Sequence, residues 1–150
     1  MSKITTILNE LKARIQLELP SHAQLTNPYN VGANTEMALK KGFGIAVGPG
    51  DNTNRNLSCK LSVNRSILIK LTTKFYATDL NVDAKEAAEK DLLESQFLII
   101  KSMEKEPTLN GNLATSGFVS DSGILRVYDD KDQFLKLESV FNFEYMEDLN

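Results

Sequence analysis

The side chains that could carry out chemistry are few, and the sequence does not bring them together. The chain of 150 residues contains one histidine, His22, and one cysteine, Cys59. A histidine acts as a general base when it lies beside a Ser or Cys nucleophile, but no spacing here predicts such a pair. His22 instead follows Pro20-Ser21 at the end of a helical pattern, where the helix dipole favours a cation. We therefore interpret His22 as a helix-end residue.

Cys59 lies on the apolar, odd-numbered side of a predicted strand. A thiol in that position is expected to be buried and to behave as a small hydrophobic side chain. Because there is only one cysteine, neither an intramolecular disulfide nor a zinc site built on cysteines is expected.

Two further segments resemble ligand-binding motifs without meeting their requirements. The glycines between Gly42 and Gly50 do not have the G-x-G-x-x-G spacing, and they begin and end a predicted strand instead of joining a strand to a helix. The acidic turn 129–132 lacks the alternating acids, central glycine and distal Glu of a calcium loop. We interpret them as a helix cap with a strand hinge, and as a solvated turn, and expect no enzyme activity, cofactor or metal.

The charge and hydropathy of the chain argue against several classes of protein. The net charge is −3, from 17 basic and 20 acidic residues, and the basic residues are dispersed along the chain. Tight DNA binding needs a concentrated basic face, so it is not expected. Brief passage of DNA along an acidic wall is compatible with this charge distribution. No apolar run approaches the roughly 18 residues of a membrane span, and the N-terminus lacks the apolar core of a signal peptide. We expect one intracellular domain, 1–150.

Three helices are predicted, two from apolar residues at three- and four-residue steps and one from its capping residues. The first covers 4–19 and ends before Pro20. A short helix over 35–41 would be capped by Asn34 and end at Gly42. A long helix runs from about 83 to Met103. Its main apolar stripe is widened by Leu93, Phe97 and Ile100, whereas Leu98 falls on the polar face as a weak interface candidate.

Strands are predicted where apolar and polar residues alternate. Residues 43–47 form a short strand, followed by a polar loop over 48–56. Residues 57–75 alternate between apolar and polar side chains. We expect a break near Asn64 because an unbroken strand would be about 60 Å long. A mobile connection over 107–123 leads to a hairpin, with strands 124–128 and 134–145 around the turn 129–132. These elements predict an α+β fold with one antiparallel sheet, an N-terminal helix, a long central helix and a C-terminal hairpin.

The long loops and the hairpin indicate binding to other protein chains. Loops of nine or more residues are usually functional or disordered, and the hairpin adds an edge strand that another chain can join. The candidate contact residues in these segments are Asp51, Asn52, Asn54, Arg55, Asn110 and Phe118.

The order of the elements resembles a known family. An amphipathic helix ending at Leu19-Pro20 precedes the strand 42–47, the strand 65–71, an acid-rich helix around 89–93 and a last strand ending in 141–145. Over nearly the whole chain this layout resembles the tail terminator (tail completion) proteins of long-tailed bacteriophages. The resemblance lies in the order of elements and not in a diagnostic motif.

The resemblance implies a structural virion protein made in the bacterial cytoplasm. It would form a homo-oligomeric ring, usually a hexamer, that caps the tail tube, ends tail elongation and offers a surface to neck or head-completion proteins, with DNA passing through the lumen. One alternative is another neck or head-completion protein of the phage connector. A second alternative is a small monomeric enzyme or ligand-binding domain that uses the 48–56 segment as a lid.

Overall fold

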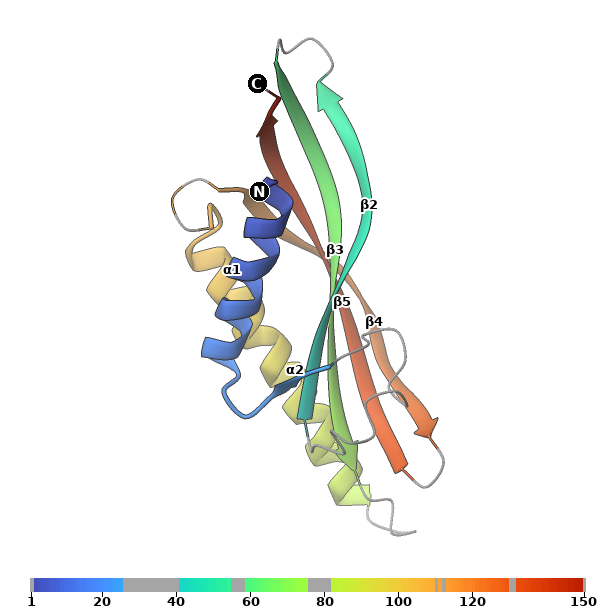
Figure 1. Cartoon of the computed structure of the whole chain (residues 1–150). Helices are drawn as coiled ribbons and strands as arrows, with labels where there is room; N and C mark the ends of the chain where they lie inside the picture. Colours follow the sequence, from blue (N-terminus) through green and yellow to red (C-terminus); the bar gives the residue numbers. More distant parts are fainter. Residues whose placement is uncertain are drawn as a thin grey trace.

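The computed structural model describes residues 2–25, 41–54, 59–75, 82–109, 111, 113–129 and 132–149. Two helices, α1 and α2, lie side by side on one face of a long, twisted five-stranded sheet (Figure 1). The α+β class is therefore confirmed. Within the described residues, neither helix combines the length and the apolar character needed to cross a membrane.

Helix α1 spans Lys3–Glu18, because Ile7, Leu11 and Ile15 recur every four residues and all three are buried. At its C-terminal end the amide of Leu19 donates to the carbonyl of Ile15 over 2.8 Å. The residue that precedes the helix, Ser2, makes no side-chain capping hydrogen bond. The start of α1 therefore needs a partner from elsewhere in the chain.

That partner is Glu147, close to the C-terminus. Its Oε1 atom accepts hydrogen bonds from the backbone amides of Lys3 at 2.6 Å and Ile4 at 3.3 Å. A carboxylate here satisfies amides that have no partner inside the helix, and its charge is favourable beside the positive end of the helix dipole. The contact fixes the first turn of α1 to the last strand of the sheet.

Helix α2 spans Val82–Lys105 and ends two residues beyond the predicted Met103. It packs on the sheet through an apolar stripe in which Leu92, Ile99 and Met103 are almost completely buried. Its position relative to the sheet is also fixed by polar contacts. Near its middle, Asp91 pairs with Lys41 at 2.8 Å and accepts a hydrogen bond from the hydroxyl of Thr73 at 3.4 Å.

The strand order is β1-β2-β3-β5-β4. The bounds are Ala23–Gln24 for β1, Lys41–Asn54 for β2, Lys60–Phe75 for β3, Thr115–Asp129 for β4 and Asp132–Asp148 for β5. All pairings are antiparallel except β1 with β2. The prediction of a purely antiparallel sheet is thus wrong at this edge. A two-residue strand is too short to show any alternation in the sequence.

The core lies between the helices and one face of the β3–β5 ladder. In the register of these strands Val63 is opposite Tyr145, Ile67 opposite Phe141, and Leu71 opposite Leu137. These side chains are buried together with Phe43, Phe143 and the apolar stripes of both helices. The alternation in the sequence correctly placed the odd-numbered residues of β3 and β5 on one apolar face.

The predicted loop over 48–56 is wrong for its first seven residues, which continue β2 to Asn54. The predicted break near Asn64 is also absent, because β3 is continuous over Lys60–Phe75. The irregularities lie on β2, where the register shifts between Val47 and Gly50 and again between Asn52 and Asn54. Each shift places one extra residue in β2, which bends that strand and leaves β3 regular.

Three further expectations need correction. The connection predicted over 107–123 ends earlier, because β4 begins at Thr115. The predicted short helix cannot include Lys41 or end at Gly42, since both belong to β2; the rest of that helix lies outside the described residues. Cys59 is exposed, not buried. It precedes β3 in a turn with φ of 56°, so the alternation of the strand does not extend to it.

We expect Glu147→Ala to lower the free energy of unfolding by about 0.5–2 kcal/mol, the usual cost of removing a helix cap. The loss follows from the two amides of α1 that would lose their acceptor. Chemical denaturation followed by circular dichroism measures it. The matched control is Glu144→Ala on the same strand, where the side chain is exposed. An equal loss in both variants would contradict the capping role.

Candidate interaction surface

The residues predicted to make contacts do not form one site. Asp51 and Asn52 are exposed on β2, and Asn54 ends that strand. Phe118 lies on β4, separated from β2 by both β3 and β5. Three strand spacings of about 4.8 Å place β2 and β4 roughly 14 Å apart. Arg55 and Asn110 lie outside the described residues.

The glycine-rich segment of β2 contacts an arginine side chain from β3. Arg65 of β3 donates from one terminal nitrogen to the carbonyl of Gly48 and from Nε to the hydroxyl of Tyr145, both over 3.2 Å. A Cβ atom on Gly50 would lie 2.7 Å from the guanidinium carbon of Arg65. The absence of a side chain at Gly50 therefore makes room for a clamp that ties β2 across β3 to β5.

Close packing also requires a glycine at position 42. A Cβ atom there would lie 2.8 Å from the side chain of Leu25 and 2.9 Å from the hydroxyl of Thr72. Gly42 pairs with Ala23 in the short parallel ladder of β1 with β2. Its role is thus to let the segment after β1 lie close against β2, and the helix-cap interpretation of this glycine is wrong.

Several large exposed apolar side chains lie on β4 and on the neighbouring side of α2. On β4, Phe118 is 36% exposed and Val119 is 60% exposed. The Phe118 ring also packs edge-on against Phe141, with 5.6 Å between the ring centroids. Val119 is the extra residue of a register shift between Phe118 and Ser120. Such bulges redirect a side chain, and this one leaves a valine facing solvent.

On α2, Leu93 is 49% exposed and Phe97 is 56% exposed. They lie one turn apart, on the same stripe as Gln96 and the half-buried Ile100. Gln96 Nε2 donates to Asp121 of β4 at 3.1 Å and to Ser139 of β5 at 2.9 Å. The stripe therefore lies on the β4 side of the helix. We call the four exposed residues Leu93, Phe97, Phe118 and Val119 the β4 flank.

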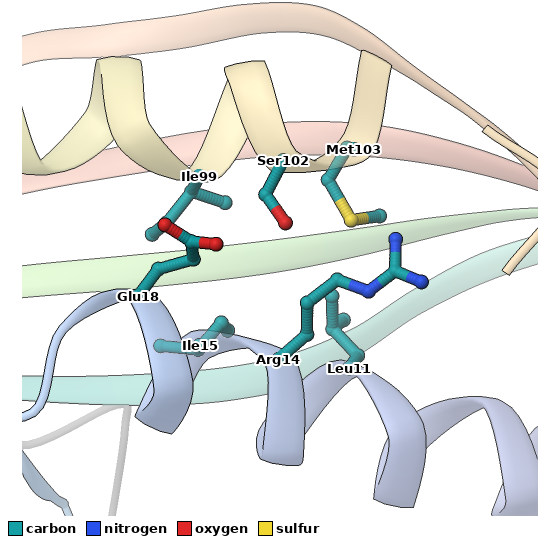
Figure 2. Close-up of a pocket in the computed structure, with 7 residues that line it drawn as sticks. All are labelled: Leu11, Arg14, Ile15, Glu18, Ile99, Ser102 and Met103. Atoms are coloured by element: carbon teal, nitrogen blue, oxygen red, sulfur yellow. The ribbon is translucent and has the colours of Figure 1, made fainter. Parts of the chain in front are cut away.

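The other side of α2 is covered by α1. Figure 2 shows Leu11 and Ile15 of α1 and Ile99 and Met103 of α2 lining the gap between the two helices. That gap has no room for a water molecule. Arg14 closes its rim by donating to both the carbonyl and the carboxylate of Glu106. This contact is helix packing and leaves no space for a ligand.

Asp121 is a charged residue of β4 that is joined to α2 by the hydrogen bond from Gln96. The pKa of its carboxyl is lowered by the hydrogen bond from Gln96 and, to a smaller extent, by the one from the amide of Gly123. Gly123 adopts φ of 71°, the left-handed region that glycine enters without strain. The turn formed by these residues interrupts the regular edge of β4 between its two straight parts.

An open groove of about 330 Å³ runs beside the start of β4. It is lined by residues 115–119 of β4 together with Asn142 and Glu144 of β5. Over the described ranges, no cluster of three or more His, Cys, Asp or Glu side chains is placed to hold a metal ion.

Neither models of protein families nor curated protein sequences give a match to this chain.

The sequence misplaced two apolar residues of α2. It assigned Leu93 and Phe97 to the widened core stripe, whereas both are exposed; the expected exposure of Leu98 is confirmed, at 37%. The hydrophobic pattern did single out both residues, but the pattern alone cannot say where the sheet ends. Because β4 is the last strand of the described sheet, the side of α2 beyond Gln96 has no described element of the same copy to pack against.

We expect Gln96→Met to lower the free energy of unfolding by about 1–3 kcal/mol, because the nearly buried hydroxyl of Ser139 loses its partner. The pKa of Asp121 should rise towards its ordinary value in the same variant. Chemical denaturation and carboxyl-carbon NMR measure these two effects. The control is Gln16→Met on the exposed side of α1. An unchanged Asp121 pKa would show that Gln96 does not set it.

Proposed function

We propose that this protein is a structural subunit of a bacteriophage tail that assembles into a ring at the head-proximal end of the tail tube. In this role it terminates tail elongation and presents a surface to neck or head-completion proteins. The observation that carries the proposal is the β4 flank, where an edge strand lies beside large exposed apolar side chains. Contiguous exposed apolar groups of this kind mark protein interfaces.

The two edges of the sheet favour contact between copies in a head-to-tail manner. At one edge, β4 has β5 as its only strand neighbour within the described part of the chain. At the other, β1 pairs only with Gly42 and Phe43, so Gly44 onwards has no strand on that side in the described ranges. Different edges on one subunit allow heterologous contacts, which close into rings when the rotation permits.

Strand direction supports this arrangement. Three successive antiparallel pairings separate β2 from β4, so these two strands run in opposite directions. If one copy places its β4 beside β2 of the next, the junction is antiparallel like most of the sheet. The helices then stay on the same side in every copy, and Leu93 and Phe97 face the neighbouring subunit.

The projecting end of the sheet supplies a candidate contact with the tail tube. In Figure 1, the ends of β2 and β3 extend beyond the N-terminus of α1. Asp51 and Asn52 lie exposed on this part of β2. Because β2 and β3 are hydrogen-bonded here and clamped by Arg65, deletion of 48–54 would remove the second half of β2. Point substitutions at Asp51 and Asn52 are therefore the appropriate probes of tube contact.

The charge balance is compatible with a lumen through which DNA passes. A net charge of −3 without a basic cluster gives DNA little to bind. The ring would thus contact DNA only during its transit. Six copies is the number that the family resemblance implies, and the tail tube protein and neck or head-completion proteins are its proposed partners.

We expect the protein to form a species of about six times 16.7 kDa, alone or on added tail tube protein, and Phe97→Asp to abolish it. A charge at the centre of an apolar contact is costly because it must lose its hydration. Light scattering on a sizing column measures the mass, and circular dichroism checks the fold. The matched control is Leu17→Asp, since Leu17 is 78% exposed on α1.

Two results would contradict the proposal. The first is a monomer that remains a monomer with tail tube protein present. The second is an assembly whose mass Phe97→Asp leaves unchanged. If the ring binds a head connector protein and not the tube, the alternative position in the neck is favoured instead.

A further inference from the structure

His22 occupies an unusual environment for a titratable side chain. It lies between α1 and β1, is 8% exposed, and its backbone amide donates to the carbonyl of Leu19 at 3.1 Å. Within the described part of the chain, neither ring nitrogen makes a hydrogen bond. A buried imidazole without hydrogen-bond partners is stable only when it carries no charge.

The charges that act on the His22 ring come from two elements. Asp91 of α2 favours the protonated ring and Lys41 of β2 opposes it. These two residues already form an ion pair of 2.8 Å. The second carboxylate oxygen of Asp91 accepts a hydrogen bond from the hydroxyl of Thr73 on β3. The carboxylate is thus engaged with other partners. Burial is the largest effect and, with Lys41, holds the pKa of His22 below its ordinary value of 6.5.

Within the described ranges, residues 23–25, which follow His22, are held to the sheet by few contacts. Strand β1 consists of Ala23 and Gln24 alone, paired with Gly42 and Phe43. The amide of Leu25 adds one hydrogen bond of 2.7 Å to the carbonyl of Phe43. The Leu25 side chain is buried against Gly42, where a Cβ atom would collide with it. So short a ladder is a part of the fold that can open locally.

We propose that His22 is a proton-operated latch that holds β1 against the edge of β2. In the closed form the neutral ring stays buried, where the charges of Lys41 and Asp91 act on it. When a ring nitrogen takes a proton from solvent, the imidazolium leaves this site to become hydrated. Because Ala23 is the next residue in the chain, the movement draws β1 away from β2. The edge of β2 at Gly42 and Phe43 is then uncovered.

The direction of the pH dependence follows from the lowered affinity of the buried ring for protons. The open form binds a proton with the ordinary affinity of an exposed histidine, so between the two pKa values it carries more protons than the closed form. The closed form is therefore fully stable well above pH 6.5 and loses stability as the pH falls below that value. One proton per opening event corresponds to about a tenfold change in the opening equilibrium per pH unit.

The consequence is a strand edge whose exposure depends on pH. An uncovered edge offers unpaired backbone groups to any extended chain. This inference stands on the contacts of His22, β1 and β2 and is independent of the proposed function.

NMR on the full chain provides the test, because the signals of the only histidine need no assignment. We expect the His22 ring to titrate below pH 6.5. Hydrogen exchange, corrected for the intrinsic pH dependence of the exchange rate, should show the protection of the Leu25 amide falling about tenfold per pH unit below that point. Amides in the β3–β5 ladder should keep their protection over the same range.

Two variants distinguish opening at His22 from a non-specific loss of stability at low pH. His22→Phe keeps a buried ring that cannot be protonated, so the protection of the Leu25 amide should no longer depend on pH. Lys41→Gln removes the opposing charge and releases Asp91, so the pKa of His22 should rise. A wild-type ring that titrates at or above 6.5 would overturn the proposal. So would an equal loss of Leu25 protection in wild type and His22→Phe.

Discussion

The pairing of β3 with β5 is the interaction on which the other elements depend. All 16 residues of β3 pair with β5, from Lys60 opposite Asp148 to Phe75 opposite Gln133. The ladder has one continuous apolar face, and leaving that face in water would forgo the largest stabilising contribution in the molecule. Both helices supply apolar stripes that cover it. β2 and β4 extend the same sheet on either side.

Polar contacts fix where the helices lie on this ladder, because apolar burial has no directional preference. Glu147 holds the start of α1 to the end of β5. Asp91 joins the middle of α2 to β2 and β3, and Gln96 joins it to β4 and β5. Each of these side chains bonds a partner distant in sequence, so together they set the register of the helix layer over the sheet.

The helix layer ends at the last strand of the sheet, and its exposed outer side connects the fold to the proposed function. α1 covers one side of α2, while the opposite side ends in Leu93 and Phe97 next to the last strand. In one copy these groups are left in water together with Phe118 and Val119. A neighbouring copy would complete the layer, which is the physical reason for proposing a ring subunit. The latch at His22 concerns the opposite edge of the sheet, where β1 covers only the beginning of β2.

The sequence by itself determined the elements with strong periodicity. The four-residue steps of Ile7, Leu11 and Ile15 specified α1, and the alternation along β3 and β5 specified which of their residues are buried. The long central helix followed from the same type of pattern. These features are local, because the spacing of apolar residues along one element decides which side of it avoids water.

Tertiary structure alone decided the rest. Residues 48–54 look like a loop, yet they form a strand because β3 supplies hydrogen-bond partners that outweigh the low strand propensity of Gly, Asp and Asn. The parallel pairing of β1 is too short to leave a pattern. Cys59 is exposed because a turn with positive φ separates it from the alternation of β3. Of the residues in the candidate site, the sequence predicts Phe118 as a contact residue and assigns Leu93 and Phe97 to the core. A pattern shows which side of a helix is apolar, but only the folded chain shows whether anything lies opposite that side.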